Sequence, residues 1–188
     1  MKMKNLLLIL VFSSAAWSSV SAQSPTSSPP LTPQQQAARD ATREKLRALL
    51  DSTGPKVNIT YKQSDKQPYN FSGELSTGLK NADDFETVIS ITPANTIGFR
   101  VFPHFSGAYI NLDKVKNSDA LMRQMARFVD KNFMYWGADE SGDIFAGFTF
   151  TLESGFPDES IRIVLRSIAN LDKYVGEMRP AIDGSTAP

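Results

Sequence analysis

The chain has 188 residues, a formal net charge of zero at pH 7, and no cysteine. This length predicts one domain, and the absence of cysteine excludes disulfides, thiolate chemistry and cysteine-ligated zinc. The balanced charge offers no basic face for nucleic acid or for an anionic membrane surface, so neither is expected as a partner.

Residues 1–22 have the pattern of a secretory signal peptide. A basic start at Lys2 and Lys4 precedes the apolar run from Leu6 to Phe12, and small residues at Val20-Ser21-Ala22 mark a cleavage site after Ala22. The run is shorter than the roughly 20 apolar residues that a membrane span needs. We therefore expect a periplasmic or secreted bacterial protein with no membrane span after the signal is removed.

The next segment, residues 23–31, is rich in serine and proline and predicts a disordered spacer. Thr32 then begins a capping box, with Pro33 as the first helical residue and Gln35 three residues after the cap. The helix is expected to end at Gly54-Pro55, with the glycine in the left-handed conformation. Its first half is weakly apolar, which predicts that it projects from the domain.

Alternating apolar residues predict a run of strands after this helix. The expected strands cover residues 56–63, 85–92, 96–102 and 108–112. The polar segment 64–84 is long for a loop in a compact domain. It is expected either to be mobile or to form an extra hairpin around residues 71–75.

A second helix is expected from a cap at Asn117 or Ser118 to about Asn132. Its apolar face comprises Leu121, Met122, Met125, Phe128 and Val129. Methionine-rich apolar surfaces adapt to binding partners, but the same side chains also fill protein cores.

Two strands and a long helix complete the pattern. The strands are expected at residues 133–136 and 144–152, and Pro157, Asp158 and Glu159 suit the first turn of the helix that follows. Apolar residues of this helix recur at intervals of three and four and form one stripe: Ile161, Val164, Leu165, Ile168, Leu171, Val175 and Met178.

The expected order of elements is α-β-β-β(-β)-α-β-β-α, within a single domain that covers residues 32–180 and is followed by a tail at 181–188. Strands joined by short turns favour an antiparallel, twisted sheet with helices packed against it. This arrangement is an α+β fold.

The segment from Asn132 to Ala169 resembles the YbjN family of bacterial proteins, which are labelled sensory transduction regulators. The matching elements are the strand at residues 133–136, the turn Ser141-Gly142-Asp143, and the helix start from Glu153 to Glu159. That family is similar in fold to type III secretion chaperones, which have a twisted antiparallel sheet with a helix before, within and after it. The resemblance implies a binding or folding-assistance role without catalysis, often as a dimer.

No catalytic, metal or cofactor site is expected from the sequence. His104, the only histidine, falls in a predicted turn, and no orienting carboxylate or substrate site can be assigned to it. The acids Asp139, Glu140 and Asp143 lack the spacing of a calcium loop, and Asp83-Asp84-Phe85-Glu86 reads as a polar strand start. An enzyme of unrecognised type is left as an alternative, because paired carboxylates are defined only by their separation in space.

Aromatic residues outside the apolar faces of their strands predict a surface for a partner. These are Phe102, Phe105, Phe133, Tyr135 and Phe145. Together with the middle helix, they give an expected surface for a protein, a peptide or a second copy of the chain, formed by Met122, Met125, Phe128, Phe102 and Phe105. The free edge of the sheet is another place for a peptide to bind.

The expected function is therefore an exported, non-enzymatic, chaperone-like module that engages a peptide or an envelope protein, in stress or sensory regulation. The alternative is a structural or stress-associated envelope protein without a dedicated ligand.

Overall fold

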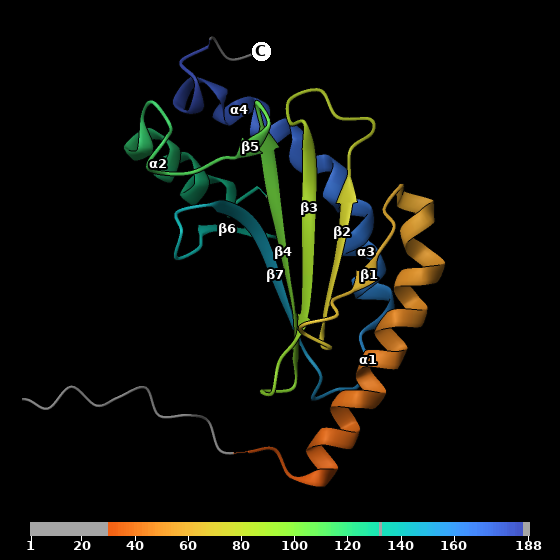
Figure 1. Cartoon of the computed structure of the whole chain (residues 1–188). Coiled ribbons are helices and arrows are strands. Elements are labelled where there is room, and N and C mark those ends of the chain that lie inside the picture. Colours follow the sequence, from red (N-terminus) through yellow and green to blue (C-terminus); the bar gives the residue numbers. More distant parts are fainter. Residues whose placement is uncertain (1–29, 132, 186–188) are drawn as a thin grey trace, which may run out of the picture. The chain divides into compact units, whose positions relative to one another are not determined.

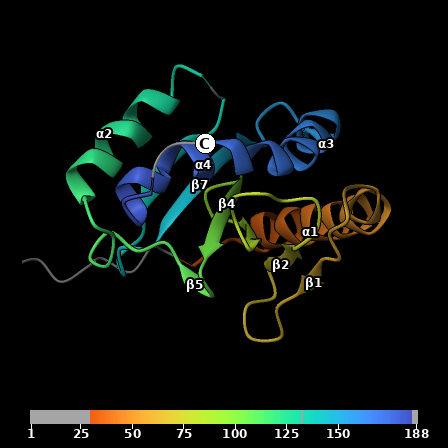
Figure 2. The same cartoon turned by 90° about the horizontal axis from the view of Figure 1, so that it is seen from above.

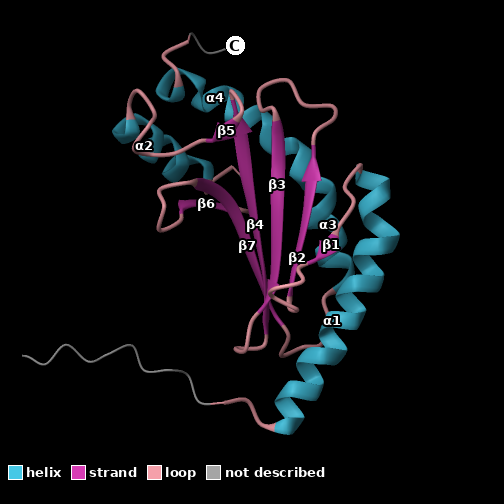
Figure 3. Ribbon diagram, viewed as in Figure 1, coloured by secondary structure: helices cyan, strands magenta, loops and turns pink. Residues whose placement is uncertain are grey.

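The computed structural model describes residues 30–131 and 133–185, and the described residues from Leu31 onward form one compact unit. The predicted signal segment and most of the predicted spacer lie outside the described residues. The elements in chain order are α1 (Pro33–Thr53), the 3₁₀ turn η1 (Gly54–Val57), β1 (Lys62–Gln63), β2 (Asn70–Leu75), β3 (Asp84–Ile91), β4 (Thr96–Phe105), β5 (Ala108–Tyr109), α2 (Ser118–Phe128), β6 (Tyr135–Ala138), β7 (Ile144–Thr151), α3 (Asp158–Ser167), the 3₁₀ turn η2 (Ile168–Leu171) and α4 (Asp172–Ile182) (Figure 3).

The strands of the described chain form one antiparallel sheet in the order β1-β2-β3-β4-β7-β6, with β5 paired to the end of β4. The predicted α+β class is confirmed. In Figure 1, α3 and α4 run behind β2 and β3, and α1 stands along the β1 side of the sheet. Figure 2, seen from above, also has α3 and α4 together on one side of the strands. None of the described helices is long and apolar enough to cross a membrane.

One face of the sheet and the helices form the core. In β3 the buried positions alternate with partly exposed ones, as expected for a strand with one face against the core. Its residue Ile89 lies opposite Phe99 of β4, and Phe99 lies opposite Phe148 of β7. The predicted apolar stripe from Ile161 to Met178 is buried along its whole length and covers this face.

The final helix is not continuous, which corrects the prediction of one long helix. The 3₁₀ turn η2 separates α3 from α4. Leu165, Ile168 and Leu171 are spaced by three residues, which is the period of a 3₁₀ helix, so the stripe stays in register through the tighter turn. The helix also continues past the predicted domain end at residue 180, because Ala181 and Ile182 belong to α4 and are buried.

The predicted strand at residues 56–63 is wrong except for its last two residues. Gly54 keeps a right-handed helical conformation and begins η1, and Asn58 takes the left-handed position instead, with φ of 59°. The backbone N–H of Ile59 bonds to the Gly54 carbonyl at 2.9 Å. Ile59 and Tyr61 are buried as predicted, but they belong to the turn and the link to β1.

Two other strand boundaries differ from the prediction. The predicted strand 96–102 continues to Phe105, and the turn falls at Ser106-Gly107, where both residues have positive φ. The predicted strand 108–112 shortens to β5, and Asn111 makes only an isolated bridge to Asp143. The hairpin alternative for the polar segment is confirmed, because β2 lies inside the sheet between β1 and β3.

The first half of α1 is held to the sheet at a few residues, although most of its side chains are exposed. Its capping box forms, with the Gln35 N–H donating to the Thr32 hydroxyl at 3.2 Å. The Arg39 guanidinium lies 3.6 Å from the centre of the Tyr69 ring and donates to the Ile91 carbonyl at 3.1 Å. The Tyr69 hydroxyl in turn donates to Asp40 at 2.7 Å.

Candidate functional site on the open sheet face

The side of the sheet that faces away from the helices is here called the open face. Its outward residues are Asn70, Ser72 and Glu74 of β2; Asp84, Glu86, Val88 and Ser90 of β3; Thr96, Gly98, Arg100, Phe102 and His104 of β4; Phe145, Gly147, Thr149 and Thr151 of β7; and Tyr135 and Gly137 of β6. This is the near face in Figure 1, where no helix lies in front of β2, β3 and β4.

A hollow of about 440 Å³ lies in this face and is here called the Gly98 hollow. It is lined by Asn70, Val88, Ser90, Thr92, Thr96, Gly98, Phe99, Arg100, Phe102, Tyr135 and Thr149. Four of these side chains carry a hydroxyl from serine or threonine, and Arg100 is the one lining residue with an ionised side chain. The hollow is therefore polar at its walls and carries a single positive charge.

Gly98 creates the hollow because it has no side chain at the centre of the sheet. A Cβ atom built at this position meets no heavy atom within 4 Å. The register places Ser90 of β3 on one side of Gly98 and Thr149 of β7 on the other. A ligand group above Gly98 would thus lie between two hydroxyls.

Tyr135 forms the wall on the β6 side. Its ring lies over Gly147, where a Cβ atom would come within 2.5 Å of the ring. Tyr135 is 44% exposed, and its ring contacts Phe145 edge to face, with 6.1 Å between ring centres. A large aromatic side chain therefore stands beside the hollow and is open to a partner.

Arg100 stands next to Gly98 along the same face. Its guanidinium lies over the Phe145 ring at 4.9 Å from the ring centre, and it makes no ion pair with any residue in the described ranges 30–131 and 133–185. The stacking holds the guanidinium by a cation–π contact while its N–H donors stay available.

The predicted aromatic residues of the sheet have separate positions. Phe102 is on the open face but is buried against Phe145, with 5.5 Å between ring centres. Phe105 is half-buried, and the Arg179 guanidinium of α4 lies 4.3 Å from the centre of its ring. Phe133 and Tyr135 are exposed. Of the aromatic residues predicted for a partner surface, Tyr135 therefore borders the Gly98 hollow with an exposed ring.

The predicted residues of the middle helix divide between core and surface. Met122 is 46% exposed, whereas Met125 is 6% exposed and Phe128 is fully buried. The Phe128 ring contacts the Tyr174 ring of α4 at 4.7 Å between centres. Met125 and Phe128 belong to the core. Of the three α2 residues predicted for a partner surface, only Met122 is exposed enough to contact a partner.

His104 is part of β4 and does not lie in a turn as predicted. Its Nδ1 atom lies 2.6 Å from the carboxylate of Asp84, the residue opposite His104 on β3. Its Nε2 atom is buried without a hydrogen-bond partner among the described residues. Nδ1 thus faces a carboxylate and Nε2 is covered, while the partly exposed ring lines a depression of about 570 Å³ together with Tyr109, Asn111 and Asp143.

A tyrosine–glutamate pair lies beside this histidine. The Tyr109 ring contacts the His104 ring edge to face at 4.2 Å between centres, and its hydroxyl donates to the Glu86 carboxylate. That hydrogen bond, together with burial, raises the pKa of Tyr109 to about 12. Within the described residues, no group of three or more histidine or acidic side chains is placed to hold a metal ion.

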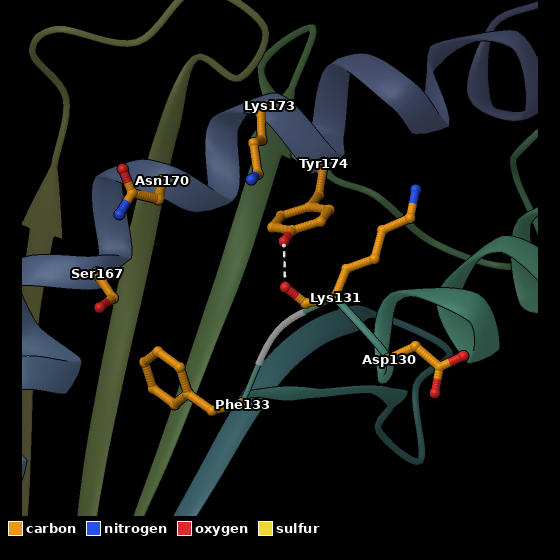
Figure 4. Close-up of a pocket in the computed structure, with 7 residues that line it drawn as sticks. All are labelled: Asp130, Lys131, Phe133, Ser167, Asn170, Lys173 and Tyr174. Carbon is orange, nitrogen blue, oxygen red and sulfur yellow. Dashed lines mark hydrogen bonds between the residues drawn. The ribbon is translucent and has the colours of Figure 1, made fainter.

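A second depression of about 580 Å³ lies between the end of α2 and α4 (Figure 4). It is lined by Asp130, Lys131, Phe133, Ser167, Asn170, Lys173 and Tyr174. The Tyr174 hydroxyl donates to the Lys131 carbonyl at 3.1 Å. In Figure 4 the ammonium groups of Lys131 and Lys173 lie on opposite sides of the Tyr174 ring. The charged groups of this depression therefore do not converge on one point.

Arg100 and Gly98 were not identified as site residues from the sequence. Both lie in β4 at the parity opposite to its apolar positions Ile97, Phe99 and Val101. That parity indicated an outward position for Arg100. Which residues of β3, β6 and β7 flank Arg100 was not predictable, however, because that depends on the register of the strands.

Comparisons with known proteins give little to classify the chain. No protein-family model matches it, and no curated protein matches it. Among solved structures, a chain in the crystal structure of the ExsC–ExsE complex aligns with 76% of this chain and 98% of its own length, with a TM-score of 0.45 and 11% sequence identity. At this identity and score, the similarity assigns neither a family nor a partner, and the resemblance to the YbjN family stays a prediction.

Proposed function

We propose that this chain is a non-enzymatic, chaperone-like binding module that holds an extended segment of another protein on its open face. The observation that carries the proposal is the Gly98 hollow, which lies in an uncovered sheet face and is lined by Arg100 and Tyr135 among others. Arginine and tyrosine are enriched among the residues that dominate binding energy at protein interfaces. A hollow with these two walls suits a protein partner.

The histidine supports binding over acid–base catalysis. A general base must reach the proton that it removes, and the Nε2 atom of His104, which is the nitrogen not facing Asp84, is buried. This arrangement instead joins the ends of β3 and β4, which stabilises the edge of the open face.

Export is part of the same proposal and rests on the signal-peptide pattern of residues 1–22. The partner would then be an envelope or secreted protein. A place in stress or sensory regulation, and association of two copies, rest on the resemblance of residues 132–169 to the YbjN family.

Site-directed photocrosslinking in cells tests the proposal. The photoreactive residue benzoylphenylalanine replaces Thr149, which is exposed on the open face, or Ile163, which is exposed on α3 in the helical layer. We expect a discrete adduct from position 149, identified by mass spectrometry as one protein, and none from position 163. An adduct from position 163 alone, or from neither position, contradicts the proposal.

A further inference from the structure

The Gly98 hollow carries one unneutralised positive charge. Its lining contains no aspartate or glutamate, and its one ionised side chain, Arg100, has no ion pair within the described part of the chain. The nearest outward acid of β3 is Glu86, which lies opposite Phe102 and binds the Tyr109 hydroxyl. The charge of the hollow therefore favours an anionic ligand group.

Hydrogen-bond donors surround the same point. Ser90 and Thr149 flank Gly98 on the two neighbouring strands, and neither hydroxyl bonds to another residue in the described ranges. Strands two apart in a sheet are separated by roughly 10 Å, which leaves room for one carboxylate between the hydroxyls. Arg100 is two residues along β4 on the same face. Its guanidinium stacks on Phe145, on the side of Arg100 away from Gly98, so a rotamer change brings its fork of N–H groups, which matches the geometry of a carboxylate, to the hollow.

We propose that the Gly98 hollow binds a glutamate or aspartate carboxylate carried by an extended acidic segment of the partner protein. The proposal deepens the function proposed above and rests on it. The carboxylate lies over Gly98, accepts hydrogen bonds from the Ser90 and Thr149 hydroxyls, and pairs with the Arg100 guanidinium. The apolar side chains beside the acid in the partner lie against Tyr135.

The shape of the hollow favours a peptide over a free small acid. The lining residues come from β2, β3, β4 and β6 as well as β7, so the hollow spreads across the sheet and extends well beyond one carboxylate. Its far wall, the exposed ring of Tyr135, offers apolar contact area that a small dicarboxylate does not use. An extended peptide fills both parts at once.

Fluorescence anisotropy with defined peptides tests this inference. The probe is a peptide of alternating Glu and Val that carries an uncharged fluorophore, and its partner probe has Gln at each Glu position. Unlabelled glutarate serves as the free dicarboxylate competitor. We expect the wild-type chain to bind the Glu peptide at least tenfold more tightly than the Gln peptide, with glutarate a weak competitor.

Three variants locate the binding. Arg100→Gln removes the charge, and Gly98→Val fills the hollow at a position where a Cβ meets no atom, so the fold is retained. We expect both to weaken binding of the Glu peptide at least tenfold. Arg123→Gln removes a charge that is also exposed, from α2, and is expected to bind like the wild type. Circular dichroism confirms that each variant is folded.

The outcomes separate this inference from the proposed function. If the Glu and Gln peptides bind equally well and Gly98→Val abolishes binding of both, recognition of a carboxylate is contradicted. The open face then remains a peptide-binding site. If glutarate competes as strongly as the unlabelled Glu peptide, the claim that the ligand is a peptide segment is contradicted. Binding that Gly98→Val and Arg100→Gln leave unchanged, or the absence of any binding, overturns the site.

Discussion

The carboxylate of Asp172 accepts a hydrogen bond from the backbone N–H of Asn81 at 2.9 Å, which joins the start of α4 to the segment before β3. The backbone N–H groups of Lys80 and Ala82 donate to the same carboxylate at 2.9 Å each. Asp172 is only 8% exposed. One buried carboxylate therefore fixes a polar segment that has little apolar surface of its own.

Asp172→Ala is expected to destabilise the domain by about 3 kcal/mol, because it leaves several backbone donors without their charged acceptor. Asp172→Asn keeps one acceptor oxygen and is expected to lose less. Urea unfolding followed by circular dichroism measures both free energies. Asp130→Ala, at an exposed carboxylate, is the control and is expected to change stability by less than about 0.5 kcal/mol. A loss equally small for Asp172→Ala contradicts the anchoring role.

The two central methionines of α2 are expected to respond differently to truncation. Met125→Ala removes a buried side chain and is expected to cost about 2–3 kcal/mol. Met122→Ala removes an exposed one and is expected to cost less than about 0.5 kcal/mol. Thermal unfolding of the two variants, compared with the wild type, measures the difference. Equal losses would show that the helix has another rotation against α4 and β6.

Tyr69→Ala is expected to loosen the first half of α1. It removes the ring under Arg39 and the hydroxyl that binds Asp40, while the second half of the helix keeps the buried residues Leu46 and Leu50. Hydrogen exchange of backbone amides is expected to accelerate in residues 36–42 and to stay unchanged in 46–53. Uniform acceleration along the helix, or none, would contradict this role of Tyr69.

Alkaline pH is expected to act on the Tyr109–Glu86 pair. The pKa of Tyr109 in the folded chain is about 12, above its ordinary value of 10.0. The protonated phenol therefore contributes stability that is fully present below the ordinary pKa and is lost as the pH rises through about 12.

Tyr109→Phe isolates this titration. Tyr61, whose pKa is also raised by burial, is present in both proteins and cancels in the difference. We expect the tyrosinate absorbance that the wild type has and Tyr109→Phe lacks to appear with a midpoint near pH 12. A midpoint near 10 in the folded wild type would show that the hydrogen bond to Glu86 is not formed.

The helices were largely predictable from the sequence because their signals are local. The capping box at Thr32 and the three-and-four spacing from Ile161 to Met178 act within one element and are confirmed. The break at η2 was not predicted, since a three-residue spacing fits an α-helical stripe as well as a 3₁₀ turn. The left-handed Asn58 was missed because the Gly54-Pro55 pair is the stronger signal for a helix end.

The candidate site was not predictable, because it depends on contacts between strands. Gly98 and Arg100 form a candidate site only because the register of the strands places Ser90 and Thr149 on either side of Gly98. The contact between His104 and Asp84 was not predictable for the same reason, since it depends on the register that places Asp84 opposite His104 on the neighbouring strand. The parity of Tyr135 did indicate an outward ring, and the structure agrees.

The most direct test of the open face as the binding surface is an NMR titration of the uniformly ¹⁵N-labelled chain with the peptide of alternating Glu and Val. We expect saturable shifts of the backbone amides of Gly98, Arg100 and Gly147 that fit one affinity and are absent in Gly98→Val. Shifts concentrated on α2 around Met122, with the β4 amides unmoved, would contradict the account.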